Sequence, residues 1–220
     1  MGAILVIRGR FPYTCGAMSF AGLGPVSLLV LGTNIVLGLV GLFVAPKIIS
    51  RCVFRPYEFA RGRNRATLIL HAFVHADLPH LLFNMITFWA FGPLLERYIG
   101  SVRLALLYAA GLVLSPFLSY RKHRDDPNYA TLGASGAISA VLFAAIVYNP
   151  TMRLMIMFLP IPIPATLFGV AYLAISWWYG RQSRGRINHD AHFLGAVTGL
   201  VFVAITDPGA WARALRIVFG

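Results

Sequence analysis

Apolar residues in this chain gather in long runs that are interrupted by few charges. Six such runs cover about 25–46, 79–95, 103–119, 133–149, 154–179 and 190–206. Each run is near or above the ~17–25 residues that a helix needs to cross a bilayer. The pattern predicts an all-α membrane protein with a six-transmembrane-helix bundle. Residues 1–24 would form an N-terminal segment, 25–207 one membrane domain, and 208–220 a C-terminal tail.

The amino-acid composition supports this prediction and indicates which kinds of partner the chain can bind. The chain has 220 residues, of which 58% are hydrophobic and 12% charged, whereas about a quarter of the residues in a soluble domain are charged. This leaves no room for a separate soluble module. The net charge of +12 comes from 19 Lys+Arg against 7 Asp+Glu. Because the basic residues lie between the apolar runs, they suit anionic lipid headgroups better than nucleic acid. We expect the lipid bilayer as a partner and no nucleic acid.

Two connections have unusual composition. The first, 47–78, is long and interleaves arginines such as Arg51 and Arg55 with aromatics such as Phe54. This mixture is typical of a segment that lies partly in the membrane interface. The Pro-Ile-Pro-Ile-Pro stretch 160–164 cannot continue a regular helix, because each proline lacks a backbone donor. It predicts an interfacial entry to the fifth helix or a break in it.

The unusual polar residues of the runs converge on one membrane face. Consecutive helices alternate in direction, so the second, fourth and sixth helices begin on the same side. His75 and His80 lie at the start of the second, Ser135 at the start of the fourth and His192 at the start of the sixth. An ionisable group at membrane depth is costly and therefore indicates function. The sequence thus predicts a single site near this face.

Ser135 is the candidate nucleophile, with His192 as its general base. A serine in a membrane helix more often serves in packing, so Ser135 alone is a weak signal. It is strengthened by Gly133 and Gly136, whose small size lets a substrate approach, and by the free N–H groups of a helix start, which can stabilise an oxyanion. Ser139 is a rival one turn deeper, but it lacks the flanking glycines.

His192 lies on a helix face built for close packing. Gly195 and Gly199 follow it at the small-residue spacing that lets two helices approach closely. Gly136 begins a matching row on the fourth helix, so the imidazole is expected to reach the serine hydroxyl. Asp190 resembles a third member of a triad but points to nearly the opposite face of the helix. We therefore predict a Ser–His dyad.

The second helix carries candidates for oxyanion stabilisation. His80 and Asn84 are four residues apart and share one helix face, where two donors can bind a developing oxyanion. The histidines at 71, 75 and 80 also allow a zinc site. Against it, no His-Glu-x-x-His pattern is present and asparagine is a poor zinc ligand, so we expect no metal and no cofactor. Glu96 lies at the far end of this helix, where we expect a structural role.

Together these motifs resemble the rhomboid family of intramembrane serine proteases, over about His71 to Gly199. The resemblance implies a six-helix bundle that hydrolyses peptide bonds within or beside the bilayer. By it, Ser135 is the nucleophile, His192 the general base, His80 and Asn84 with the Ser135 amide the oxyanion hole, and His75 a supporting histidine. The matching motifs are His75, His80-Leu-Leu-Phe-Asn84, Glu96 to Gly100, Gly133-Ala-Ser135-Gly136, and Ala191-His192 with Gly195 and Gly199.

Two positions depart from the family pattern. Many rhomboids carry Trp-Arg in the first loop, where this chain has Ala66-Thr67 with Arg65 nearby. An aromatic residue often follows the serine by four and stacks on the histidine, whereas this chain has Ser139. His192 would then be held either more loosely or by another ring, such as that of Phe193. Neither departure removes a reacting group.

The leading hypothesis is an intramembrane serine endopeptidase that acts on transmembrane protein substrates. We expect a multi-pass protein of a prokaryotic cytoplasmic membrane. One alternative is a catalytically silent relative that binds transmembrane clients, and another is a histidine-lined metal or proton transporter. A serine-directed probe separates the first two, and bound metal or proton flux that survives loss of Ser135 would indicate the third.

Overall fold

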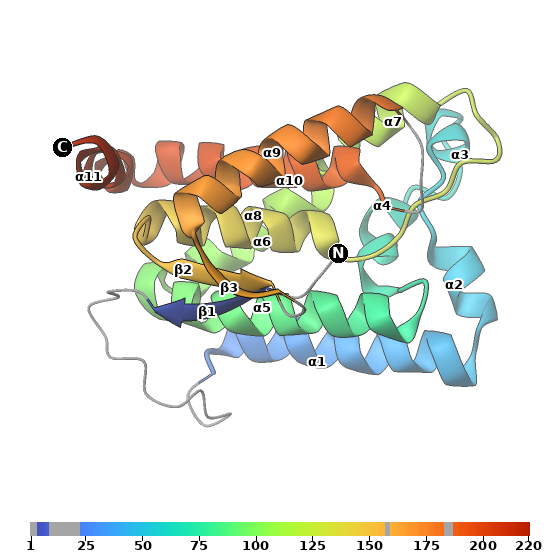
Figure 1. Ribbon diagram of the computed structural model, residues 1–220. Helices are drawn as coiled ribbons and strands as arrows, with labels where there is room; N and C mark the ends of the chain where they lie inside the picture. Colours follow the sequence, from blue (N-terminus) through green and yellow to red (C-terminus); the bar gives the residue numbers. More distant parts are fainter. Residues whose placement is uncertain (1–3, 9–22, 157–158, 183–186) are drawn as a thin grey trace.

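The computed structural model describes residues 4–8, 23–156, 159–182 and 187–220. Long helices run nearly parallel to one another, and a small sheet lies beside them (Figure 1). The elements in chain order are β1 (Ile4–Arg8), α1 (Pro25–Leu39), η2 (Val40–Val44), α2 (Lys47–Cys52), α3 (Pro56–Ala60), α4 (Thr67–Leu70), η3 (His71–Phe73), α5 (Leu78–Ile99), α6 (Ser101–Leu114), α7 (Phe117–His123), α8 (Ser135–Tyr148), β2 (Arg153–Ile156), β3 (Leu159–Pro164), α9 (Ala165–Gln182), α10 (His189–Thr206) and α11 (Pro208–Phe219).

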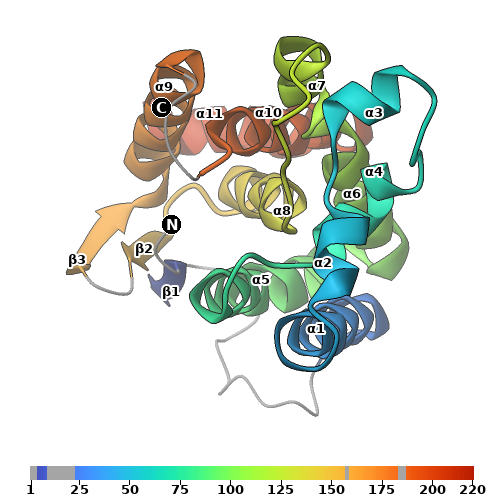
Figure 2. The same cartoon turned by 90° about the vertical axis from the view of Figure 1, so that its right-hand side faces the viewer.

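Helix α8 is the centre of the bundle, with α5, α6, α9 and α10 around it (Figure 2). All of its residues from Ser135 to Val147 are buried. Its small residues allow this central position because neighbouring backbones can come close to them. A Cβ added to Gly111 of α6, for example, would lie 2.9 Å from the Cα of Ala137.

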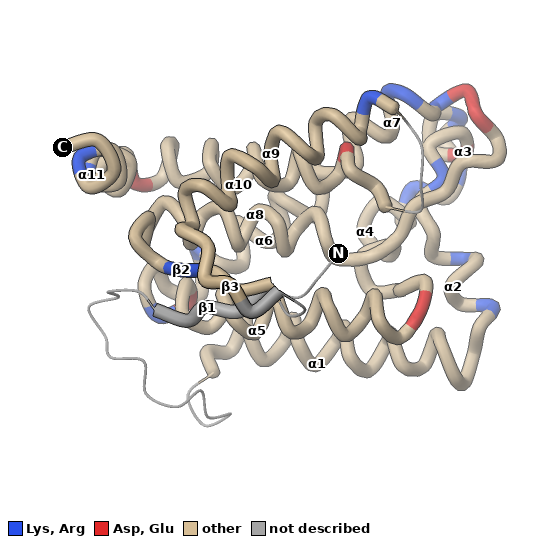
Figure 3. The backbone as a smooth tube through the Cα atoms, viewed as in Figure 1, with Lys and Arg blue, Asp and Glu red and all other residues tan. Residues whose placement is uncertain are grey.

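The chain is a multi-pass integral membrane protein. Within the described residues, four helical stretches are long and apolar enough to cross a membrane: Pro25–Val44, Leu78–Ile99, Ser101–His123 and His189–Thr206. Helix α8 is shorter, with 14 residues, or about 21 Å at ~1.5 Å per residue. Charged residues gather toward the ends of the long helices and leave their middles uncharged (Figure 3). The predicted helical membrane bundle is thus confirmed, and the count of six crossings stays a prediction.

The predicted helix at 154–179 is wrong at its start, up to residue 164. Residues 153–156 and 159–164 form the antiparallel strands β2 and β3 instead, and α9 begins only at Ala165. The alternating prolines of β3 are compatible with an edge strand, because each removes a donor on one side only. The backbone N–H of Ala165 donates to the carbonyl of Met152 at 2.9 Å. The proline stretch therefore ends a hairpin and starts the helix.

The two chain ends also form regular structure that the sequence did not indicate. Strand β1 pairs antiparallel with β2 to complete a three-stranded sheet. The predicted tail forms α11, whose first turn is capped by the Asp207 carboxylate accepting from the N–H of Ala210 at 3.0 Å. Figure 1 shows α11 crossing the end of the bundle with its axis turned away from that of α10.

Glu96 fastens α1 to the far end of α5. Its carboxylate accepts hydrogen bonds from the N–H groups of Val26 at 3.0 Å and Ser27 at 2.8 Å, and from the hydroxyl of Ser101 at 2.7 Å. The first two donors are unpaired groups at the start of α1, where a negative charge is favoured. The structural role expected for Glu96 therefore consists of capping a neighbouring helix.

Candidate active site

Ser135 and His192 are in hydrogen-bond contact. The Nε2 atom of His192 lies 2.8 Å from the Oγ atom of Ser135. Both residues are buried, Ser135 with 7% exposure and His192 with 5%. Ser135 is the first residue of α8, and His192 lies in the first turn of α10. The two helices therefore bring a hydroxyl and an imidazole together at the same end of the bundle.

Direct backbone contact between α8 and α10 sets this distance. A Cβ added to Gly195 would lie 2.1 Å from the carbonyl oxygen of Gly136, and one added to Gly199 would lie 2.2 Å from that of Ala140. No side chain fits in either place, because real Cβ atoms do not approach closer than 3.0 Å. Gly195 and Gly199 thus lie against the backbone of α8, about one helical turn apart along the interface.

Gly133 and Gly136 make room on the serine side. Gly133 has a φ of +104°, a conformation that favours glycine. A Cβ there would lie 2.7 Å from Nε2 of His80, so the absence of a side chain lets the imidazole reach the serine loop. A Cβ on Gly136 would lie 2.1 Å from the hydroxyl oxygen of Ser115 in the connection after α6. Both glycines are required by packing around Ser135.

His80 and Asn84 line the same cavity as the Ser–His pair. This cavity has a volume of about 630 Å³ and is walled by the beginnings of α5, α8 and α10, the end of α9 and the loop before Ser135. Asn84 is 2% exposed, and its Nδ2 atom has no hydrogen-bond partner among the described residues. A buried amide donor without a partner is costly. It is therefore available to an oxygen atom that enters the cavity.

His75 lies behind His80 and outside the cavity. It is completely buried, and its ring meets that of His80 edge to face with centroids 5.1 Å apart. Burial, with the nearby His80 as a second cause, lowers the pKa of His75 to about 3. The ring is therefore neutral near pH 7 and packs against His80 without adding charge.

The ring beside His192 belongs to Tyr172 of α9, and the suggestion of Phe193 is replaced. The two centroids are 6.2 Å apart with an interplanar angle of 28°. Ser139 occupies the position, four residues after the serine, where the family pattern often has an aromatic residue. It donates to the carbonyl of Ser135 at 2.8 Å and pairs with the Tyr172 hydroxyl at 2.7 Å. No sequence signal marked Tyr172, because its approach depends on how α9 is rotated against α8 and α10.

The remaining polar candidates have structural partners. Asp190 forms an ion pair with Lys122 at 2.6 Å, so its carboxylate is engaged away from His192. His189 stacks on Tyr179, with centroids 5.2 Å apart. Across the part of the chain that the structure describes, no three His, Cys, Asp or Glu side chains converge as metal ligands.

The first loop is fixed without the Trp-Arg pair. Thr67 stands at that position, and its hydroxyl donates to the carbonyl of Asn64 at 2.6 Å. Its own carbonyl accepts from Nδ1 of His71 at 3.0 Å. Burial lowers the pKa of His71 to about 4, so this ring is a neutral donor near pH 7. The carbonyl of His71 accepts in turn from the N–H of Gly133 at 2.8 Å, which ties the loop to the serine segment.

These features define a helical membrane protein with a hydrogen-bonded Ser–His pair at the wall of a cavity. The Rhomboid domain model matches residues 63–208, and the chain belongs to the rhomboid family. The resemblance seen in the sequence is thereby confirmed.

Several known proteins are similar in sequence to this chain over more than half of its length. RHOMBOID-like protein 12, mitochondrial, of Arabidopsis thaliana is 30% identical over 206 residues, which cover 82% of this chain and 58% of the relative. Presenilin-associated rhomboid-like protein, mitochondrial, of Homo sapiens is 29% identical over 160 residues, or 69% of this chain and 40% of the relative. Rhomboid protease GlpG of Haemophilus influenzae is 28% identical over 134 residues, or 61% of this chain and 66% of the relative.

The matched region is only part of each relative, from 40% to 66% of its length. One of the three names states a protease, and two place the relative in mitochondria. These matches do not support the expected prokaryotic cytoplasmic membrane.

Proposed function

We propose that this chain is an intramembrane serine endopeptidase that hydrolyses peptide bonds of transmembrane proteins. The observation that carries the proposal is the 2.8 Å contact between His192 Nε2 and Ser135 Oγ at the wall of a 630 Å³ cavity. A nucleophile and a base within hydrogen-bond reach are the basic requirement of covalent acyl transfer. No carboxylate among the described residues bonds to His192, so the proposal is a dyad.

The reaction follows from the positions of the two side chains. As Ser135 Oγ attacks the scissile carbonyl carbon, His192 Nε2 accepts the hydroxyl proton. The protonated imidazole then donates that proton to the leaving amine, and the acyl group stays on Ser135. A water molecule, deprotonated by His192, hydrolyses this ester and restores both side chains. The cavity can hold such water at the edge of the bundle.

His80, Asn84 and the backbone N–H of Ser135 are the proposed oxyanion hole. The Nδ2 atom of Asn84 is buried and has no hydrogen-bond partner among the described residues, and the His80 ring borders Gly133 next to the nucleophile. Donors that are fixed in a cavity stabilise a developing negative charge without having to reorient. Removal of one such donor typically lowers kcat about 10²–10³-fold.

We further propose that α8 and α9 complete a bundle of six crossings with α1, α5, the α6–α7 pair and α10. An even number of crossings puts both chain ends on the same side of the membrane. Single cysteines placed before α1 and after α10, in a chain whose own cysteines are replaced, would react with an impermeant reagent from the same side. Reaction from opposite sides would contradict the six-crossing arrangement.

The decisive experiment combines cleavage with covalent labelling of the purified protein in detergent or lipid. The wild type is expected to cleave a transmembrane reporter and to react with a fluorophosphonate probe at Ser135. Ser135→Ala and His192→Ala are expected to lose both activities while remaining folded. Cleavage by either folded variant at the wild-type rate would overturn the dyad.

Ser139→Ala is the matched control, because it removes a hydroxyl one turn along the same helix. Loss of labelling in Ser139→Ala but not in Ser135→Ala would reassign the nucleophile. A wild type that binds transmembrane clients without cleaving them or labelling would favour the silent client-binding alternative.

A further inference from the structure

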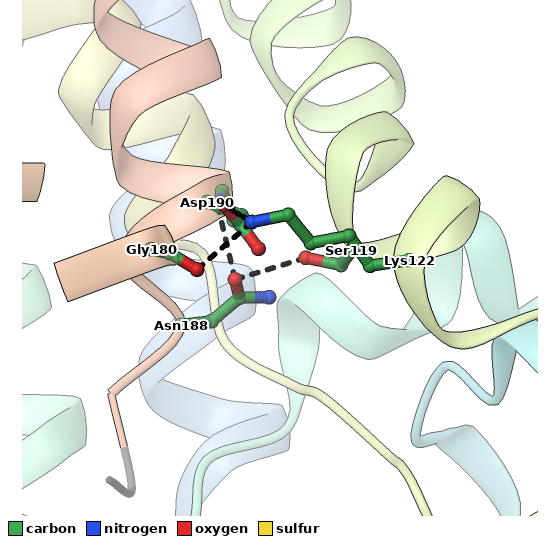
Figure 4. Close-up of polar contacts among 6 residues, drawn as sticks. Ser119, Lys122, Gly180, Asn188 and Asp190 are labelled. Atoms are coloured by element: carbon green, nitrogen blue, oxygen red, sulfur yellow. Dashed lines mark hydrogen bonds and ion pairs between the residues drawn. The ribbon is translucent and has the colours of Figure 1, made fainter. Parts of the chain in front are cut away.

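The side chain of Asn188, just before α10, joins three separate segments of the chain. Its Oδ1 atom accepts from the N–H of Ala191 at 3.0 Å, which caps α10, and from the hydroxyl of Ser119 in α7 at 2.9 Å. Its Nδ2 atom donates to Oγ1 of Thr131 at 2.9 Å. Figure 4 shows the bonds that it makes between α7 and α10.

The orientation of the amide follows from these partners. A backbone N–H can only donate, so the atom that faces Ala191 has to be the oxygen. The NH₂ group then faces Thr131, whose hydroxyl oxygen can accept. The amide therefore acts as a two-sided connector, with its oxygen on α7 and α10 and its nitrogen on the loop before Ser135.

Thr131 is itself held firmly by the first loop. Its backbone forms two hydrogen bonds with that of Phe54, at 2.9 and 3.0 Å, and Gly133 bonds to the carbonyl of His71 at 2.8 Å. Ser135 follows Thr131 by four residues. Asn188 likewise precedes His192 by four residues. The Asn188–Thr131 bond therefore joins the two segments that lead into the reacting residues, at a point four residues before each of them.

We propose that Asn188 is a positioning residue that holds the start of α10 against the loop before α8, and so keeps His192 within reach of Ser135. This inference rests on the function proposed for the Ser–His pair. Gly195 and Gly199 fix the spacing of α8 and α10 further along the helices. The Asn188–Thr131 bond would fix it at the end where the reaction takes place.

A second bridge between α7 and α10 offers a control. Lys122 of α7 donates to the carboxylate of Asp190 at 2.6 Å and to the carbonyl of Gly180 in α9 at 2.8 Å (Figure 4). This bridge joins the same two helices as Ser119 and Asn188 do, but it does not include the loop before Ser135. Its loss should destabilise the bundle without releasing that loop from His192.

The test measures the rate constant of fluorophosphonate labelling well below the temperature of unfolding, together with the unfolding midpoint. Asn188→Ala and Thr131→Val are each expected to slow labelling about tenfold, because a small displacement of the base from the nucleophile is costly. The double variant should label no more slowly than Asn188→Ala alone, because Asn188→Ala already removes the hydrogen bond that Thr131→Val removes. Thr131→Val keeps the cap of α10 and tests the bond even where Asn188→Ala folds poorly.

Two further variants separate positioning from general stability. Asn188→Asp should label within about twofold of the wild type, because its carboxylate still accepts from Ala191 and the Thr131 hydroxyl can turn to donate. Lys122→Met should lower the unfolding midpoint and leave the labelling rate constant within about twofold.

The outcomes are distinct. Wild-type labelling by folded Thr131→Val, additive losses in the double variant, or equal slowing in Lys122→Met would overturn the positioning role while leaving the Ser–His proposal intact. Absence of labelling in the wild type would overturn the proposed function itself.

Discussion

Replacing Gly195 with alanine should separate the two residues of the proposed dyad. The new Cβ would lie 2.1 Å from the carbonyl oxygen of Gly136, whereas ordinary contacts begin at about 3.4 Å and real Cβ atoms do not come below 3.0 Å. The obstacle is backbone, so the helices themselves have to move apart by about 1 Å. Since Gly195 follows His192 by one turn, the 2.8 Å contact to Ser135 would lengthen to about 3.8 Å. That distance is too long for a hydrogen bond.

Misplacement of a catalytic group by about 1 Å can cost roughly 10²-fold in rate. We therefore expect the fluorophosphonate labelling rate of folded Gly195→Ala to fall about 100-fold, together with a lower unfolding midpoint. Gly199→Ala meets a similar obstacle at Ala140, but Gly199 lies about 6 Å further from His192 along the helix than Gly195 does, at ~1.5 Å per residue. Its effect on labelling should be smaller.

Gly32→Ala in α1 is the matched control, because a Cβ there meets nothing within 4 Å. Alanine favours a helix over glycine by about 1 kcal/mol, so this variant should be as stable as the wild type or more so, with unchanged labelling. Folded Gly195→Ala that labels at the rate of Gly32→Ala would refute the reasoning.

Three further predictions concern the supports of the site. Glu96→Gln should weaken the charge-assisted bonds to α1, lower stability by about 2 kcal/mol and leave labelling of the folded protein within twofold; a large labelling defect at unchanged stability would contradict this. Tyr172→Ala should slow labelling more than Tyr172→Phe, which keeps the ring on His192 and loses only the bond to Ser139; equal effects would argue against a role for the ring. Burial lowers the pKa of His71 from 6.5 to about 4, so the unfolded chain takes up the proton first as pH falls, and stability should drop by up to about 3 kcal/mol between pH 6.5 and 4. His71→Gln should show a shallower dependence in unfolding measured over this range, and an unchanged slope would assign the effect to other groups.

The sequence by itself determined the class of protein and the candidates for its chemistry. Long apolar runs fix a helical membrane protein, because only internally hydrogen-bonded elements survive in lipid. Alternation of the helices placed Ser135 and His192 on one face, since direction follows from the number of crossings. The small residues at 195 and 199 indicated which surface of the sixth run would pack closely.

The tertiary structure decided what depends on rotation, register and contacts between distant segments. Periodicity does not say which ring faces His192, so Tyr172 was missed and Phe193 was suggested in its place. Local pattern also failed at 154–164, because a strand needs partners from elsewhere in the chain, here including Ile4–Arg8. A short polar side chain such as Asn188 carries no signal of its own. Its role arises only where the fold brings α7, α10 and the loop before Ser135 within hydrogen-bond distance of one amide.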